Sequence, residues 1–320
     1  MEIRRLGETG LTTSRIGLGL AALGRPVYID VGRDGDLGNE RTRAAMEARC
    51  DAVLDAAYAA GIRYVDAARS YGDAEAFLGA WLEAGDRPDV VVGSKWGYTY
   101  VGEWRLDADV QEVKDLSAAA LRRQIADSRR LLGDRLSLYQ IHSATIESGV
   151  FDDREVLDEL RSLRESGLFL GFSTSGPQQS DSILRGLHEC IDGEPLFSTV
   201  QSTWNVPEPS VGPALAEAHA DGRGVLIKEA MANGRLAAAD GPLGGIAGRL
   251  RTTPDRVALA AVLAQPWADV VLSGAVTVEQ IRSNASALDV RLPADALRAM
   301  ETLAQPPGRY WTDRAALPWR

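Results

Sequence analysis

The chain has 320 residues, of which 45% are hydrophobic and 25% charged, and its formal net charge is −10. A chain of this length can bury a large core, and α/β barrels of this size commonly form one domain, so we expect a single domain. The net negative charge argues against nucleic acid as a partner, because binding to phosphates needs clustered lysine and arginine side chains.

The cysteines and the apolar runs exclude further classes. Cys50 and Cys190 match no metal-ligand spacing, so we expect no metal site. No apolar run approaches the roughly 20 residues that span a bilayer. The opening residues MEIRRLGETG lack the apolar core of a signal peptide, so we expect a cytoplasmic protein with reduced cysteines. We expect a monomer or a small homo-oligomer.

Short apolar runs that end in glycine, serine or aspartate alternate with longer segments of helical period, as in repeated βα units. The predicted strands are 15–20, 63–67, 89–94, 136–142, 168–173, 198–202, 224–228 and 269–273. The predicted helices are 40–60, 73–83, 117–132, 153–166, 179–189, 211–221, 253–264 and 278–288. Eight of each favour a closed (β/α)8 TIM barrel. An open doubly wound sheet could use the same elements, but its G-x-G-x-x-G fingerprint is absent after the first strand.

Three segments lie outside this repeat. Residues 1–11 are expected to form a short hairpin, 96–114 a long loop after the third strand, and 305–320 an aromatic tail. In a barrel of this type the active site lies at the carboxyl ends of the strands and in the loops that follow them. The third loop should therefore lie beside the site, and the tail is a candidate for the same place.

Four titratable residues lie at or shortly after three consecutive strand ends. They are Asp66 and Tyr71 in DAARSYG, Lys95 in VVVGSKWGY and His142 in LSLYQIH. A polar residue that ends a buried strand often only reaches water, so none of the four identifies a site alone. Lys95 carries more information, because only three of the 35 basic residues are lysines and two of these end strands. Lysine, unlike arginine, changes its pKa readily when buried.

These residues and the words around them, GIRYVDAARSYGDAEAFLG, VVVGSKWG and LYQIHS, resemble the aldo-keto reductase family over nearly the whole chain. The resemblance implies an oxidoreductase that transfers a hydride between a nicotinamide cofactor and the carbonyl or alcohol of a small aldehyde, ketone or sugar. It implies that Tyr71 is the general acid and base, and that Lys95, paired with Asp66, favours its phenolate. His142 would orient the carbonyl.

Later segments resemble the family's cofactor site. Ser173 and Thr174 in GFSTSG and Gln201 in VQSTWN occupy the positions that hold the nicotinamide carboxamide, although the family usually has asparagine at position 174. The segment VLSGAVTVEQIRSNASAL resembles the adenosine phosphate site, with Ser273, Gly274, Ala275, Thr277, Gln280 and Asn284 at contact positions. Many members carry lysine at 274 and arginine at 280, and both are missing here. NADP(H) is favoured because the family mostly uses it, and NAD(H) is an alternative.

The seventh strand departs further from the family. In the family the seventh strand usually ends in a sequence such as AYSPL, whose tyrosine stacks on the nicotinamide. Here the sequence is IKEAM, which places Lys228 at that cofactor-binding position, followed by Glu229. The two residues could pair with each other or with the barrel rim, or they could bind a substrate hydroxyl or carboxylate. A set of aromatic residues is predicted to line the substrate pocket, or else to anchor long loops: Tyr28, Trp96, Tyr98, Trp104 and Trp311.

Two other functions are compatible with a barrel. An aldolase-like enzyme would form a Schiff base at Lys228 or Lys95. This would explain why two of the three lysines end strands, but not the segments that resemble the family's cofactor site. A nucleotide-binding sensor or accessory barrel would need no catalytic tetrad, yet the tetrad is present in the sequence.

Overall fold

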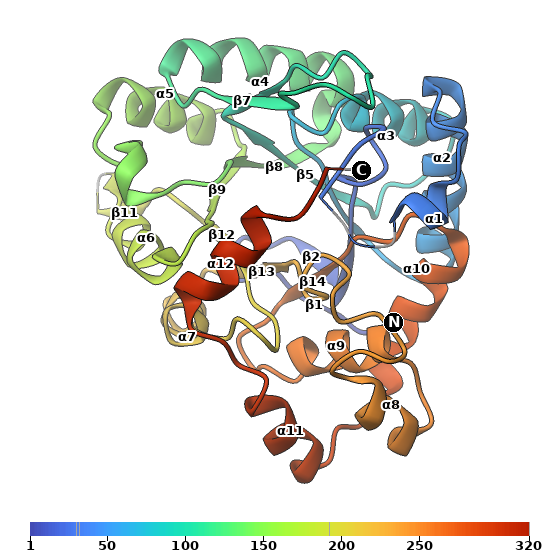
Figure 1. Cartoon of the computed structure of the whole chain (residues 1–320). Coiled ribbons are helices and arrows are strands. Elements are labelled where there is room, and N and C mark those ends of the chain that lie inside the picture. The colour runs from blue at the N-terminus through green and yellow to red at the C-terminus, as the bar shows by residue number, and fades with distance from the viewer. Residues whose placement is uncertain (30, 32, 192, 320) are drawn as a thin grey trace.

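Eight parallel strands form a closed barrel at the centre of the molecule (Figure 1). The computed structural model describes residues 1–29, 31, 33–191 and 193–319. The barrel strands are β3 (Ile16–Gly19), β4 (Tyr64–Asp66), β5 (Val91–Trp96), β8 (Leu136–Ile141), β9 (Phe169–Ser173), β12 (Thr199–Thr203), β13 (Gly224–Lys228) and β14 (Val270–Ser273). Strand β14 pairs in parallel with β3 and so closes the barrel. The predicted (β/α)8 TIM barrel is confirmed.

Helices surround the barrel, and after each barrel strand the chain forms one of them (Figure 1). They are α2 (Arg43–Ala59), α3 (Ala74–Glu83), α4 (Ala118–Leu132), α5 (Arg154–Glu165), α6 (Gln179–Leu187), α7 (Gly212–Ala220), α9 (Pro254–Leu263) and α10 (Val278–Ala285). Side-chain caps define several starts: Ser117 accepts from the backbone of Ala120 at 3.2 Å. No helix among the described residues is long and apolar enough to cross a membrane.

Apolar side chains fill both the barrel and the layer between strands and helices. Inside the barrel, Tyr64, Leu138 and Leu226 pack with Leu6 from the N-terminal hairpin of β1 (Ile3–Arg5) and β2 (Thr12–Ser14). Leu6 is fully buried. Burying a leucine completely contributes roughly 1.5–3 kcal/mol, so the hairpin is held to the barrel by this contact. The expected N-terminal hairpin is present.

Several shorter elements stand outside the repeat. The third loop forms a hairpin of β6 (Tyr98–Tyr100) and β7 (Glu112–Lys114), and β10 (Cys190–Ile191) pairs with β11 (Glu194–Pro195). The additional helices are α1 (Arg33–Leu37), α8 (Gly244–Leu250), α11 (Ala294–Glu301) and α12 (Pro307–Ala315), with 3-10 turns η1 (Gly133–Arg135), η2 (Ile146–Ser148) and η3 (Ser286–Asp289). Most of the expected aromatic tail is thus helical, and α12 crosses the face of the barrel (Figure 1).

Candidate functional site

The four predicted catalytic side chains lie together at the carboxyl ends of β4, β5 and β8. Lys95 is buried, and its Nζ donates to the Asp66 carboxylate and, at 2.9 Å, to the carbonyl of Ala67. The same Nζ lies 4.9 Å from the centroid of the Tyr71 ring. The rings of Tyr71 and His142 meet edge to face, with centroids 5.5 Å apart. The structure therefore brings all four into one cluster.

Burial determines the protonation of this cluster. Burial raises the pKa of Tyr71 well above its usual range, the Asp66 carboxylate raises it further, and the Arg25 guanidinium opposes the rise. Burial, followed by the positive charges of Lys95 and Lys228, holds the pKa of His142 well below its usual value. At neutral pH Tyr71 therefore carries its proton and His142 is a neutral imidazole. Both can donate a hydrogen bond to an oxygen placed between them.

Arg25 is a site residue that the sequence did not reveal. Its buried guanidinium lies 5.4 Å from the centroid of Tyr71 and 4.9 Å from those of both Tyr28 and Trp319. It donates to the carbonyl of Ser70 at 3.0 Å and to Glu112 of β7 at 2.8 Å. Nothing in the word LGRP distinguishes this arginine from the 31 others, so only the structure could identify it.

A cavity of about 240 Å³ opens over Tyr71 and His142. Tyr28 and Tyr98 line it, as predicted for a substrate pocket, together with Trp319. The other predicted aromatic residues do not line this cavity, which corrects the expectation. Trp96 is fully buried in the core, Trp104 donates to the carbonyl of Arg41, and Trp311 of α12 packs in an apolar cluster with Met300. These three residues anchor loops and helices.

A groove leads from Tyr71 to the start of α10. Its first part, a cavity of about 100 Å³, is lined by Tyr71, Gln201, Lys228 and Ser273. Its second part, of about 530 Å³, is lined by residues of the β14–α10 segment, including the predicted Ala275, Gln280 and Asn284. The two cavities share Met231, Gly234 and Gly274, so they adjoin. A Cβ atom at Gly274 would meet nothing within 4 Å, so the groove is open there.

Gln201, which lines the first part of this groove, carries one unsatisfied acceptor. Its Nε2 donates to Asp66 at 2.9 Å, whereas its buried Oε1 has no hydrogen-bond partner among the described residues. A buried amide oxygen without a donor is costly, and the amide of a bound carboxamide would satisfy it. The groove therefore fits the nicotinamide end of a dinucleotide cofactor at Gln201.

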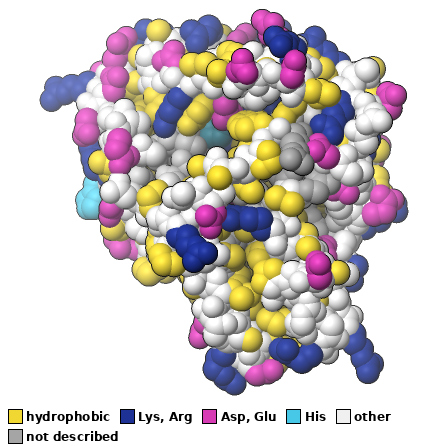
Figure 2. All heavy atoms as spheres, viewed as in Figure 1, with side chains coloured by type: hydrophobic (Ala, Val, Ile, Leu, Met, Phe, Trp, Pro, Cys, Tyr) yellow, Lys and Arg dark blue, Asp and Glu magenta, His cyan; other side chains and the backbone are white. Residues whose placement is uncertain are grey.

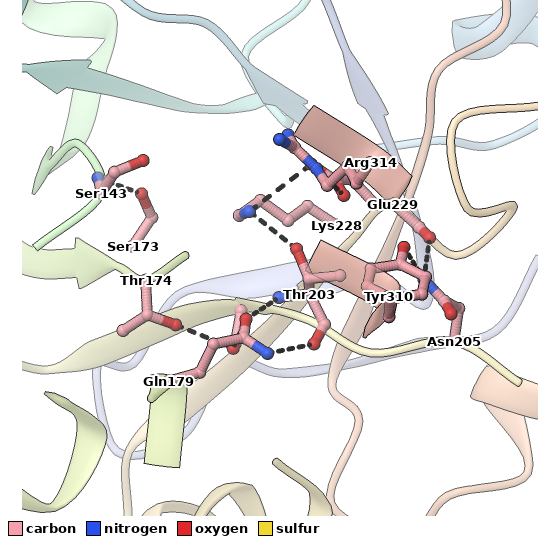
Figure 3. Close-up of polar contacts among 11 residues, drawn as sticks. Ser143, Ser173, Thr174, Gln179, Thr203, Asn205, Lys228, Glu229, Tyr310 and Arg314 are labelled. Carbon is pink, nitrogen blue, oxygen red and sulfur yellow. Dashed lines mark hydrogen bonds and ion pairs between the residues drawn. The ribbon is translucent and has the colours of Figure 1, made fainter. Parts of the chain in front are cut away.

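Ser173 and Thr174 lie in the barrel wall, at the end of β9 and just after it. The Ser173 hydroxyl accepts from the backbone N–H of Ser143 at 2.9 Å, and the Thr174 hydroxyl lies 2.8 Å from that of Ser202 (Figure 3). Both residues are fully buried, and neither lines the groove or the cavity over Tyr71. The hydroxyls contact other residues of the barrel wall, and the contact of these two residues with the carboxamide stays a prediction.

The far end of the groove is acidic. Thr277 caps α10 by accepting from the backbone of Gln280 at 3.2 Å. The Gln280 side chain accepts from the backbone of Val276 at 2.8 Å and donates to Asp36 of α1 at 2.7 Å. The Asn284 amide lies 2.7 Å from the Ser273 hydroxyl. Asp36, Asp255 and Glu279 line this part, and no lysine or arginine is among its described lining residues.

Lys228 and Glu229 join the barrel rim to α12 (Figure 3). Lys228 donates to the Thr203 hydroxyl at 2.8 Å, and its Nζ lies 3.7 Å from Glu229. Arg314 donates to both oxygens of Glu229, at 2.8 and 2.5 Å. Burial would raise the pKa of Glu229, but Arg314 and Lys228 outweigh it and hold this pKa at about 2. Burial lowers the pKa of Lys228 to about 8. The main partner of Glu229 is therefore Arg314, and not Lys228.

Charged side chains of both signs gather at the middle of this face, over α12, beside a recess in which a histidine is visible (Figure 2).

Among the described residues, no group of three or more histidine, cysteine, aspartate or glutamate side chains could hold a metal ion.

The family model of the aldo/keto reductase family matches residues 15–305. Protein tas of Escherichia coli is 24% identical in sequence to this chain, over 95% of this chain and 98% of its own length. The NADH-specific methylglyoxal reductase of the same species is 25% identical, over 94% and 97% of the two chains. The fold matches an aldo-keto reductase of Bacillus halodurans with a TM-score of 0.71, 21% identity, and coverage of 96% and 97%. This chain therefore belongs to the aldo/keto reductase family.

Proposed function

We propose that this protein is a nicotinamide-dependent oxidoreductase, a single barrel domain that reduces the carbonyl of a small substrate or oxidises the corresponding alcohol. The observation that carries the proposal is the position of Tyr71, which lines both the groove that contains Gln201 and the cavity beside His142. A proton donor shared by a cofactor groove and a substrate cavity is what carbonyl reduction needs. Neither the Schiff-base enzyme nor the sensor barrel accounts for this arrangement.

The chain's own residues would act on the carbonyl oxygen. When bound, the nicotinamide supplies or accepts the hydride at the carbonyl carbon. Tyr71 gives its hydroxyl proton to the oxygen, and the neutral His142 donates a hydrogen bond that orients and polarises the carbonyl. Lys95 and Arg25 supply the positive field that stabilises the resulting phenolate. In the oxidation direction Tyr71 takes the proton back.

The cofactor expected from the resemblance is NADP(H), but the acidic end of the groove supports NAD(H). A 2′-phosphate beside Asp36, Asp255 and Glu279 would be repelled by like charges. The ribose hydroxyls of NAD(H) can instead donate to such carboxylates. The name of the related NADH-specific methylglyoxal reductase agrees with this choice. We therefore propose NAD(H) as the preferred cofactor.

A panel of small aldehydes and ketones, incubated with the purified protein and NADH, tests the proposed activity. We expect at least one of them to cause loss of the absorbance of reduced nicotinamide and to yield the corresponding alcohol. If NADH binds, as measured by quenching of tryptophan fluorescence, but no carbonyl compound is reduced, the enzyme proposal fails and a binding function takes its place.

A further inference from the structure

Lys228 lies where the two cavities of the site meet. It lines the cofactor groove with Gln201 and the substrate cavity with His142, and Tyr71 is likewise shared by both. The Lys228 side chain is 17% exposed and borders the space of both cavities. A substrate whose carbonyl oxygen lies beside Tyr71 therefore has Lys228 within reach of its remaining atoms.

The charges around the substrate cavity do not balance. Among its described lining residues three are cationic and two are acidic: Arg25, Lys228, Arg314, Glu112 and Glu229. Glu112 accepts a hydrogen bond from Arg25 at 2.8 Å, and Glu229 accepts two from Arg314. Each of these carboxylates thus has an arginine as its close partner. The remaining positive charge of the described lining is the ammonium of Lys228.

The ammonium of Lys228 has donors to spare. Of its three N–H groups, one is directed at the Thr203 hydroxyl, at 2.8 Å. Glu229 Oε1 is 3.7 Å away, beyond hydrogen-bond distance, and already accepts from Arg314 at 2.5 Å. Because the pKa of Lys228 is about 8, this side chain is protonated in most molecules at neutral pH. The partly buried cation therefore favours an anionic acceptor inside the cavity.

We propose that the substrate is a small oxo acid, a carbonyl compound with a carboxylate that Lys228 binds while Tyr71 and His142 hold the carbonyl oxygen. This inference rests on the proposed function. A volume of about 240 Å³ accommodates a short oxo acid. A neutral polyol would also accept hydrogen bonds from Lys228, but it would bring no negative charge to the ammonium group.

Matched pairs of substrates test the inference. Glyoxylate, malonate semialdehyde and succinate semialdehyde are each compared with their methyl ester, which keeps the carbonyl and removes the charge. For the best pair, we expect the wild type to favour the acid over the ester in kcat/KM by about tenfold or more, as for a charge-assisted contact. In Lys228→Met this ratio should fall to about one. In Lys228→Arg, which keeps a cation, a preference for the acid should persist.

Lys114→Met is the matched control. It removes a lysine of β7 that does not line the cavity, so the acid-to-ester ratio should remain that of the wild type. Equal efficiency for acids and esters, or a preference that survives Lys228→Met, would overturn the inference and leave the proposed function standing. A Lys228 adduct trapped by borohydride would also overturn it, since the lysine would then be a nucleophile. If no carbonyl compound is reduced although NADH binds, it is the proposed function that fails.

Discussion

At the scale of single residues, we propose that Gln280 influences which cofactor the groove accepts at its adenosine end. It links the backbone of Val276 to Asp36, whereas family members that bind a 2′-phosphate often carry arginine there. We predict that the wild type binds NADH more tightly than NADPH. We expect Gln280→Arg to improve NADPH affinity about tenfold or more, because an arginine on a phosphate is a charge-assisted contact. Dissociation constants from tryptophan quenching measure both effects.

Arg256 is the control for this prediction. It donates from Nε to the Ser283 hydroxyl at 3.1 Å, and Ser283 lines the acidic end of the groove. If the wild type prefers NADPH and Arg256→Ala abolishes that preference, the 2′-phosphate is bound by Arg256 and the choice of NAD(H) is wrong.

Arg25 leads to a prediction about pH. Its guanidinium lowers the pKa of Tyr71 against the effects of burial and Asp66. Replacing it by methionine should raise the pKa of Tyr71 further, so the rate of alcohol oxidation should require a higher pH than in the wild type. Arg25→Lys keeps the charge and should restore most of the profile. An unchanged pH profile of kcat in Arg25→Met would show that Arg25 only supports Glu112 and Trp319.

At the scale of elements, α12 is held over the site by one buried ion pair. The Glu229 side chain is 8% exposed and that of Arg314 20%, and Asn205 donates to Tyr310 of α12 at 2.8 Å. Breaking such a pair leaves a buried charge, so we expect Glu229→Gln to lower the free energy of unfolding by about 3 kcal/mol at neutral pH. Arg309→Ala, on the exposed side of α12, should change this free energy by less than about 0.5 kcal/mol.

The same pair has a defined pH dependence. The groups that face Glu229 are Arg314, Lys228 and Arg235, and together they lower its pKa from 4.5 to about 2. A carboxylate with a lowered pKa stabilises the fold above its unfolded pKa, and this stabilisation is lost as the pH falls. The difference between wild type and Glu229→Gln should therefore shrink between pH 4.5 and about 2. A difference that is constant across this range would contradict the assignment.

The elements also show what a sequence can predict. Most of the barrel strands were recognisable because they are short, buried and largely apolar, although β12 (TVQST) is mainly polar, and Ser117 marked the start of α4 correctly. Helix α8, with the sequence GGIAGRL, has no helical propensity to recognise and is stabilised by packing of Ile246 and Ala247. The Pro306-Pro307-Gly308 start of α12 reads as a turn, although Pro307 stands at the first helical position.

The site, like the fold, was predictable from the sequence in part. The tetrad lies at strand ends, and strand ends meet at one edge of a barrel, so its residues could be grouped from their order in the chain. The directions of the Ser173 and Thr174 hydroxyls depend on Ser143 and Ser202, which come from other strands and loops. Likewise, Trp96 and Trp311 turn into the core because of neighbours that are distant in the sequence.

At the scale of the whole molecule, the account predicts a metal-free enzyme that its cofactor stabilises. Dialysis against EDTA should change neither the rate nor the melting temperature. NADH at about 100 times its dissociation constant should raise the free energy of unfolding by about 2.7 kcal/mol, because it binds only the folded barrel. Loss of activity on dialysis that a divalent cation restores would contradict this, as would an unchanged melting temperature at saturating NADH.

The most direct test of the central claim is the rate of hydride transfer in Tyr71→Phe, measured in a single turnover with NADH and a reducible aldehyde. The variant keeps the ring and removes the proton donor, so we predict that the rate falls by about a hundredfold or more while NADH affinity stays close to that of the wild type. Tyr139→Phe removes a buried tyrosine hydroxyl elsewhere in the barrel and should retain its activity. If Tyr71→Phe keeps more than about a tenth of the wild-type rate, Tyr71 is not the acid and the account is wrong.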